Sequence, residues 1–231
     1  MAIKHSIWTI TAKTNLHVGN ESSANFGIID KAVQRDPITS LPCINASSLK
    51  GALNEHFSKM TDNYFEVFGS DKKEGQKAST KGLCSFFDAA LVAIPEQCDS
   101  AELFELCSTS NVLADFDNKV KLFGIEGIRI QDYVRHPLNR EKRIVLKEND
   151  FCGLYDDFGL PVIARNRVGE QRNLWYEQVI PRETVFATMI SYPEENDCCK
   201  TFIEQLNNTV VQIGANATIG YGYCLFKRIN L

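Results

Sequence analysis

Residues 27–51 read GIIDKAVQRDPITSLPCINASSLKG, and this stretch joins two segments of different character. Its first part holds Asp30 and Arg35 among turn-forming residues, and two prolines exclude that part from a helix or a central strand. Apolar side chains then recur at helical spacing, so we predict a helix over residues 47–60. The polar loop therefore runs directly into the N-terminus of a helix that packs on the core.

This junction carries the residue types that hold a phosphate. Ser47 and Ser48 are predicted to cap the helix, and Lys50 lies in its first turn. Free backbone N–H groups, hydroxyls and an ammonium at a helix start attract an anion. Because Asp30 precedes them in the same stretch, the residues favour phosphodiester chemistry. They also fit an ordinary capped helix with a solvated aspartate, and the sequence alone leaves both interpretations open.

Length and composition indicate one globular domain over residues 1–231. Hydrophobic residues make up 44% of the chain and charged residues 23%, which is typical of a globular protein. No apolar run approaches the ~20 residues of a membrane span. The N-terminal residues MAIKHSIWTI alternate between apolar and polar, unlike a signal peptide. We therefore expect a cytoplasmic protein with no membrane partner.

The eight cysteines do not form a CxxC pattern, so we expect no structural zinc site. Most of them lie among apolar residues, which predicts reduced, buried thiols at Cys43, Cys84, Cys107, Cys152 and Cys224.

The formal net charge of −4 argues against a free-standing nucleic-acid-binding protein, which is usually basic. Two local segments are nevertheless basic, residues 129–143 and 165–172. An acidic chain with basic islands fits a subunit of a larger assembly, and it also fits ordinary solvated charge.

The regular segments alternate in an order typical of one fold. Apolar periodicity predicts strands over 3–12, 83–93, 184–191 and 209–229, and helices over 47–60 and 194–208. This β-α-β-β-α-β order predicts an α+β, ferredoxin-like (RRM-like) core formed by about 1–93 and 184–231. An insertion of about residues 94–183 then separates its two halves.

Several local features accompany this plan. Asp88 interrupts the second strand and is either at a bend or functional, with a bend or a hydrogen-bonded role favoured. The polar residues 69–82 predict an exposed loop. Within the insertion, residues 101–107 and 112–122 are predicted to be helical. Residues 160–165 and 173–180 are predicted to form a β-hairpin, whose second strand directs Trp175 and Tyr176 to opposite sides.

Two further features are candidates for function. His17 follows the first strand, where it could serve acid–base chemistry, bind a phosphate or be structural. Residues 214–223 read GANATIGYGY, and their glycines let the backbone adopt positive φ or pass close to something bulky. This segment precedes a strand and no helix follows it, so it is not a nucleotide-binding fingerprint or a P-loop.

Eight stretches, taken in order, resemble one known family. They are LHVG at 16–19, GIIDKAVQRD at 27–36, SSLKGAL at 47–53, FGS at 68–70, FFDAAL at 86–91, LPVIARN at 160–166, LWYEQVIPRETVF at 174–186 and IGANATIGYGYC at 213–224. In them the chain resembles the repeat-associated (RAMP) proteins of type III CRISPR effector complexes. The likeness is greatest to the backbone subunit of the Cmr (type III-B) complex, although the Csm backbone subunit shares much of the pattern.

The resemblance implies a function and its partners. Copies of the subunit would stack into a helical filament along a CRISPR RNA, together with other RAMP subunits and the large Cas10-type subunit. A β-hairpin thumb from each copy would flip out a nucleotide of the guide–target duplex. The filament would then cleave target RNA at regular intervals with a divalent metal, expected to be Mg²⁺.

The resemblance also implies roles for individual residues. Asp30 matches the family's catalytic aspartate, and His17 and Glu177 match catalytic positions near it. No metal ligand is assigned directly. The predicted RNA contacts are Arg35, Ser47, Ser48, Lys50, Gly214, Asn216, Gly220 and Gly222.

The match has departures. Residues 94–100 read IPEQCDS, without the arginine usual in the family there, and the insertion is compact. Three hypotheses therefore stay open: a guided endoribonuclease subunit, a non-catalytic RNA-binding scaffold in which Asp30 is idle, and an unrelated α+β enzyme that shares local motifs.

Overall fold

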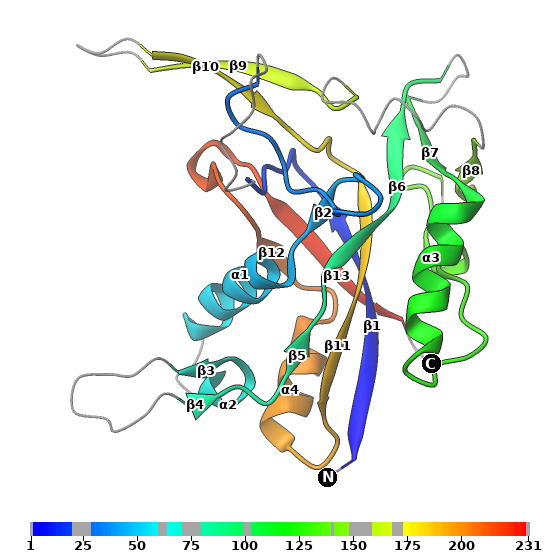
Figure 1. Cartoon of the computed structure of the whole chain (residues 1–231), viewed down its shortest axis with the longest axis vertical. Helices are drawn as coiled ribbons and strands as arrows, with labels where there is room; N and C mark the ends of the chain where they lie inside the picture. Colours follow the sequence, from blue (N-terminus) through cyan, green and yellow to red (C-terminus); the bar gives the residue numbers. More distant parts are fainter. Residues whose placement is uncertain are drawn as a thin grey trace.

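A mixed sheet forms the middle of the protein (Figure 1). The computed structural model describes residues 2–19, 29–59, 64–70, 80–98, 103–139, 141–147, 159–167 and 173–229. Within these residues the main path of the sheet runs β12 (Val210–Gln212), β13 (Tyr223–Ile229), β1 (Ile3–Ala12), β11 (Val185–Pro193), β6 (Ala89–Glu96), β7 (Glu105–Ser108) and β8 (Val145–Leu146). Two short strands join off this path, β2 (Cys43–Ile44) on β6 and β5 (Ser85–Phe86) on β11. The pair β7–β8 is parallel and the other pairs of this sheet are antiparallel, so the predicted α+β class is confirmed.

Strand β1 is central because it pairs with β11 on one side and β13 on the other. Its side chains alternate between the two faces of the sheet. Trp8 and Ile10 enter one hydrophobic core, and Ile7 enters another. Every residue of β11 is buried, as expected for a strand that is covered on both faces.

Helices cover both faces of this sheet. Figure 1 shows α1 (Ala46–Ser58) and α4 (Asp197–Leu206) on one side and α3 (Ser110–Lys121) on the other. The first core also takes residues from α2 (Phe65–Phe68), and the second takes them from the 3-10 turn η2 (Ile130–Tyr133). The second core thus depends on α3 and η2, which lie within the predicted insertion.

Smaller elements complete the chain. The predicted hairpin is confirmed as β9 (Val162–Arg167) and β10 (Asn173–Gln178), with Trp175 opposite Arg165 in its register. In Figure 1 it lies beyond one end of the sheet. Strands β3 (Gly69–Ser70) and β4 (Thr80–Lys81) pair at the two ends of the predicted loop, and the 3-10 turn η4 (Ala217–Ile219) lies in the glycine-rich segment. The hairpin tip, residues 168–172, and residues 71–79 lie outside the described residues.

The structure corrects the predicted start of the first helix. The helix begins at Ala46, and its N–H donates to Asp88 Oδ1 at 2.6 Å. Ser47 and Ser48 therefore do not cap the helix, because a carboxylate from the bend between β5 and β6 does so. The predicted bend at Asp88 is confirmed, and it splits the predicted strand 83–93 into β5 and β6.

Another prediction, a helix over residues 101–107, is wrong. Residues 105–108 form β7, which pairs with β6 through Cys107 and Ile94. Clustered apolar residues fit a short strand and a short helix equally well, so periodicity could not distinguish them. Residues 105–108 form a strand and not a helix because the edge of β6 was open to pair with them.

Five of the seven described cysteines are buried. Burial raises the pKa of Cys224 to about 12, and it is also the main cause that raises the pKa of Cys43 to about 12. These thiols stay protonated at neutral pH, which confirms the interpretation of Cys43, Cys84, Cys107 and Cys224 as small buried hydrophobes. Cys152 lies outside the described residues. No helix among the described residues is long and apolar enough to cross a membrane.

Replacing the distant cap should weaken α1. We predict that Asp88→Ala lowers the free energy of unfolding by about 1 kcal/mol, because the N–H of Ala46 loses its acceptor. Urea unfolding of the purified chain measures this change. Ser47→Ala is the matched control and should change it by no more than a few tenths of a kcal/mol. The reverse order of the two effects would show that Ser47 is the cap after all.

Candidate functional site

The segment after residue 29 is hydrogen-bonded along β10. The N–H of Asp30 donates to the carbonyl of Tyr176 at 3.0 Å, and the N–H of Tyr176 donates to Asp30 Oδ2 at 2.7 Å. The N–H of Gln178 then donates to the carbonyl of Lys31 at 2.9 Å. Asp30 is exposed to solvent yet fixed to the hairpin, so its carboxylate is presented at a defined position.

His17 lies behind this segment and is nearly fully buried. Its Nδ1 lies 2.7 Å from the carbonyl oxygen of Gln178. Because a carbonyl can only accept, Nδ1 carries the proton in this contact, and in the neutral ring Nε2 then holds a lone pair. A Cβ added at Gly19 would lie 3.3 Å from Nε2, so this glycine leaves room beside the ring nitrogen.

Glu177 brings the buried polar groups together. Its side chain is 1% exposed, and Oε1 lies 3.9 Å from His17 Nδ1 and 3.9 Å from Arg165 Nη2. The side-chain amide of Asn216 donates to the same oxygen. A buried carboxylate is costly unless it is paired and hydrogen-bonded, and here Arg165 supplies the opposite charge. The predicted residues His17, Glu177 and Asn216 therefore form one cluster.

Arg165 is a member of this cluster that the predicted site residues did not include. Its guanidinium lies over the ring of Tyr221, 4.7 Å from the ring centroid. The contact joins β9 to the glycine-rich segment, and Glu177 lies on the neighbouring strand β10. Arg165 occurs in the matching stretch LPVIARN and begins the basic segment 165–172, and these are the signals in the sequence that could have identified it.

The glycines of this segment are required by the protein's own backbone. Gly214 has φ +78° and Gly222 has φ +82°, the left-handed region that favours glycine. A Cβ at Gly214 would collide with the carbonyl oxygen of His17, and one at Gly222 with that of Ile213. The predicted bulky neighbour is therefore main chain, whereas Gly220 faces open space.

Gln34 links this region to the start of α1. Its Oε1 accepts from the N–H of Asn45 at 2.8 Å, and its Nε2 donates to Ser48 Oγ at 2.8 Å and to the carbonyl of Gly19. One buried amide thus joins the segment after β1, the Asp30 segment and the first turn of α1.

The remaining predicted RNA contacts lie beside this helix start. Ser47 is exposed and Lys50 half-buried in the first turns of α1. Arg35 Nη1 donates to the carbonyl of Ser40 at 2.7 Å. These three residues lie on the α1 side of Gln34, and the cluster around Glu177 lies on the β10 side.

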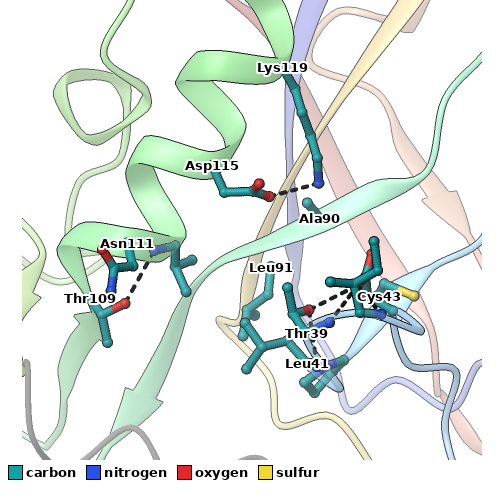
Figure 2. Close-up of a pocket in the computed structure, with 13 residues that line it drawn as sticks. Thr39, Leu41, Cys43, Ala90, Leu91, Thr109, Asn111, Asp115 and Lys119 are labelled. Atoms are coloured by element: carbon teal, nitrogen blue, oxygen red, sulfur yellow. Dashed lines mark hydrogen bonds and ion pairs between the residues drawn. The ribbon is translucent and has the colours of Figure 1, made fainter.

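A cavity of about 560 Å³ lies next to this helix start, between the segment 36–43 and α3. Figure 2 shows Thr39 and Leu41 on one side of it and Asn111 and Asp115 on the other. The N–H groups of Ile38 and Thr39 and the hydroxyl of Thr39 donate to Asp36 at the edge of the cavity. Burial by itself raises the pKa of Asp36, but these hydrogen bonds outweigh it, so the pKa lies below its usual value.

A metal site made of protein ligands alone is not formed by the described residues, since no three His, Cys, Asp or Glu side chains among them are grouped to hold an ion. Asp30 Oδ2 accepts a hydrogen bond from Tyr176, and Oδ1 has no hydrogen-bond partner within the described ranges. One carboxylate oxygen fits Mg²⁺ only where a substrate supplies further oxygens.

The family model of the RAMP superfamily matches residues 9–225. The chain belongs to the RAMP superfamily. A curated relative, the CRISPR system Cmr endoribonuclease Cmr4 of Pyrococcus furiosus, is 24% identical over an alignment of 273 positions that spans 91% of this chain and 90% of the relative. The CMR subunit Cmr4 of Saccharolobus solfataricus is 38% identical over 90 residues, 37% of this chain and 27% of that protein.

Solved RAMP structures share the fold. A chain of the type III-B Cmr-beta complex bound to cognate target RNA superposes with a TM-score of 0.73 at 22% identity, covering 97% of both chains. Oligomeric Cmr4 from Pyrococcus furiosus superposes with a TM-score of 0.65 at 18% identity, covering 99% of both chains. The resemblance noted from the sequence motifs is thus confirmed for the family.

Gly214 and Gly220 form a matched pair for the close approach to His17. We predict that Gly214→Ala lowers the free energy of unfolding by roughly 1–3 kcal/mol more than Gly220→Ala, because a new Cβ meets backbone only at Gly214. Both variants bear the positive-φ cost of about 1–2 kcal/mol. Urea unfolding compares them, and equal losses would contradict a steric role for the carbonyl of His17.

The turn at Asp36 should make stability depend on pH. A carboxyl whose pKa is lowered by folding stabilises the protein above its unfolded pKa of about 3.9, and this contribution is lost as pH falls through the folded pKa. We therefore expect Asp36→Ala to destabilise the chain at neutral pH, by an amount that shrinks in acid below about pH 4. Urea unfolding across this range measures the difference, with the exposed Asp197→Ala as control. A difference from wild type that does not vary with pH would contradict the prediction.

Proposed function

We propose that this chain is a backbone subunit of a Cmr-type (type III-B) CRISPR ribonucleoprotein, which holds CRISPR RNA and cleaves complementary target RNA. The observation that carries the proposal is the exposed Asp30 carboxylate, fixed to the hairpin by Tyr176 in front of the buried His17–Glu177 cluster. The names of the Cmr relatives and the match of the whole fold support it.

We further propose that the core is the ferredoxin-like fold. Strands β1, β6, β11 and β13 alternate with α1 and α4 in the order β-α-β-β-α-β along the chain. Within the sheet these strands are ordered β13-β1-β11-β6, with the first and third strands adjacent in the middle. This arrangement brings the ends of β1 and β13 together beside the glycine-rich segment.

Asp30 is the group that we assign to contact the scissile nucleotide. Its unpartnered Oδ1 can take the proton of a ribose 2′-hydroxyl. The 2′-oxygen then forms a bond to the adjacent phosphorus, the bond from phosphorus to the 5′-oxygen of the next nucleotide breaks, and that 5′-oxygen takes a proton from water to leave as a hydroxyl. The reaction needs the attacking oxygen in line with the leaving oxygen, so most of the acceleration must come from positioning the RNA.

The hairpin is the element that we assign to distort the RNA. As the proposed thumb, β9–β10 would enter the guide–target duplex and unstack a nucleotide, which costs a few kcal/mol and must be offset by protein contacts. Because Asp30 is hydrogen-bonded to Tyr176 of the same hairpin, the hairpin would hold the distorted nucleotide and the carboxylate at fixed positions relative to each other.

His17 and Glu177 support this site from behind. Both are almost fully buried, and Glu177 accepts from Asn216 and lies near Arg165, so it holds β10 against the glycine-rich segment. His17 binds the carbonyl of Gln178, two residues after the anchor of Asp30. We therefore assign them to fix the position of the Asp30 segment.

The Asp30 carboxylate would help to hold a divalent ion, expected to be Mg²⁺, with the RNA supplying the other oxygen ligands. When bound, the ion neutralises charge that develops on the scissile phosphate. The guide strand would lie beside the start of α1, with Lys50 and Arg35 against its phosphates and with Ser47 and Ser48 nearby. Gly214, Asn216, Gly220 and Gly222 would shape the adjoining surface.

The proposed partners follow from the same assignment. They are CRISPR RNA, target RNA, further copies of this chain in a helical filament, other RAMP subunits and a Cas10-type large subunit. A solved relative, Cmr4 from Pyrococcus furiosus, is described as oligomeric.

A non-catalytic scaffold is the second candidate. Asp30 Oδ2 accepts from a backbone N–H, as a purely structural aspartate would. The two candidates differ in what happens when the carboxylate is neutralised while its hydrogen bond is kept.

We predict that Asp30→Asn lowers target-RNA cleavage by at least about 100-fold in the assembled complex, because an amide cannot accept the proton. Guide and target binding should stay within a few-fold, since the side-chain oxygen of Asn can still accept from Tyr176. Single-turnover cleavage and filter binding measure the two quantities. Asp197→Asn, on the exposed start of α4, is the control, and cleavage at the wild-type rate by the Asp30 variant would favour the scaffold.

A further inference from the structure

A second cavity, of about 410 Å³, lies on the face of the sheet that α3 covers elsewhere. Its floor is formed by β1 and β13, with Thr9, Lys13 and Lys227 among its lining residues. Its wall is the segment 133–137 that follows η2, with Tyr133 and Arg135. None of its lining residues belongs to the Asp30 segment, the His17 cluster or the start of α1.

The charges around this cavity do not balance. Lys13 pairs with Glu183 at 2.8 Å. Lys227 and Arg135 form no ion pair with a carboxylate in the part of the chain that the structure describes, and Arg135 Nη1 donates to the carbonyl of Val134. The cavity thus has an excess of about two positive charges, although the chain as a whole is acidic. A hollow lined by one sign of charge concentrates the field on an anion.

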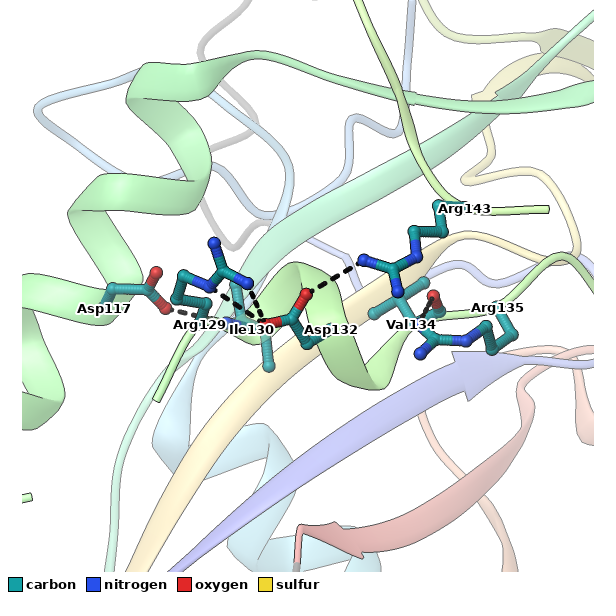
Figure 3. Close-up of polar contacts among 7 residues, drawn as sticks. All are labelled: Asp117, Arg129, Ile130, Asp132, Val134, Arg135 and Arg143. Atoms are coloured by element: carbon teal, nitrogen blue, oxygen red, sulfur yellow. Dashed lines mark hydrogen bonds and ion pairs between the residues drawn. The ribbon is translucent and has the colours of Figure 1, made fainter. Parts of the chain in front are cut away.

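Further charged side chains lie beyond the wall of the cavity. Figure 3 shows Arg129 and Arg143 on either side of Asp132, with Arg135 beside Arg143. Asp132 lies 2.8 Å from Arg129 and 3.3 Å from Arg143, and Asp117 also interacts electrostatically with Arg129. These two carboxylates offset the two guanidiniums, so the excess positive charge is that of the cavity itself.

An aromatic ring lies at the same edge. Tyr133 lines the cavity and is 43% exposed. Stacking of a base on an aromatic side chain is insensitive to base identity, and cations nearby hold the backbone. Together the ring and the two cations that form no ion pair within the described residues match the base and the phosphate of a nucleotide.

We infer that this cavity binds one nucleotide of a single-stranded stretch of RNA, with its phosphate on Lys227 and Arg135 and its base on Tyr133. The inference rests on the proposed function only for the identity of the polymer, because the phosphate and ring contacts belong to residues with no part in cleavage. The RNA that passes through this site is a second contact, separate from the guide phosphates at α1.

The test removes the two cations in the full-length chain. Arg135→Ala combined with Lys227→Ala should weaken binding of a fluorescently labelled ten-nucleotide oligouridylate by about tenfold or more. Loss of two phosphate contacts should also lower the magnitude of the log–log salt slope by ~1.4, at ~0.7 for each contact with a single strand. Lys59→Ala combined with Lys200→Ala removes the same charge from α1 and α4 and should leave both quantities near wild type. Fluorescence anisotropy between about 50 and 200 mM salt measures them.

Substitution of Tyr133 tests the same inference independently of the two cations. Tyr133→Ala should weaken binding by at least about fivefold, as loss of one base stack predicts, without changing the salt slope. Tyr133→Phe keeps the ring and should bind like wild type. Thermal unfolding of each variant, unchanged from wild type, separates loss of binding from loss of fold.

Further measurements decide whether the cavity binds RNA, a free nucleotide or inorganic phosphate. If adenosine monophosphate or inorganic phosphate binds at the cavity by calorimetry while the oligouridylate is insensitive to the double variant, the RNA assignment is overturned. Equal losses in the double variant and its charge-matched control would also overturn it, because they would reflect net charge alone. Cleavage by the Asp30→Asn complex tests the proposed function, and oligouridylate binding by the Arg135 and Lys227 variants tests this cavity, so failure of the proposed cleavage and failure of this site give different results.

Discussion

The hydrogen bonds between the Asp30 segment and β10 fix the position of the Asp30 carboxylate. Tyr176 exchanges hydrogen bonds with Asp30 through both its N–H and its carbonyl, and Gln178 continues the ladder to Lys31. These hydrogen bonds hold the Asp30 segment against β10 in the way an added strand is held. They also fix the direction of the Asp30 carboxylate. Hairpin, aspartate and glycine-rich segment consequently behave as one unit.

That unit depends on a buried carboxylate. Glu177 lies within the protein, where an isolated charge would cost several kcal/mol, and its single contacting oxygen is approached by Arg165, Asn216 and His17. Such a group ties three segments together because removing any partner leaves the others unsatisfied. The requirement for glycine at residue 214 has the same origin, since the backbone there packs directly on the carbonyl of His17.

The two faces of the sheet are covered by helices to different extents. One face is closed by α1 and α4, and Asp88 from the β5–β6 bend caps α1 from outside its own sequence neighbourhood. The other face is only partly covered by α3, which leaves the ends of β1 and β13 beside a basic wall from η2. Although the chain is acidic overall, it can therefore present positive side chains both at the start of α1 and at the wall beside η2.

The sequence by itself determined the elements and their order. Alternation in residues 3–12, helical spacing after residue 47 and the paired strands of the hairpin are local patterns, and local sterics and burial periodicity suffice to read them. The sequence also identified the family, because eight short motifs in fixed order carry information that composition does not.

Only the tertiary structure decided what these residues contact. Residues 105–108 became a strand because the edge of β6 was available. Ser47 is not the cap because the helix already begins at Ala46, whose N–H donates to Asp88. Arg165 gained a role because Glu177 and Tyr221, 12 and 56 positions further along the chain, meet it in space. Contacts between residues so far apart depend on how the sheet and hairpin pack, and no local pattern records that.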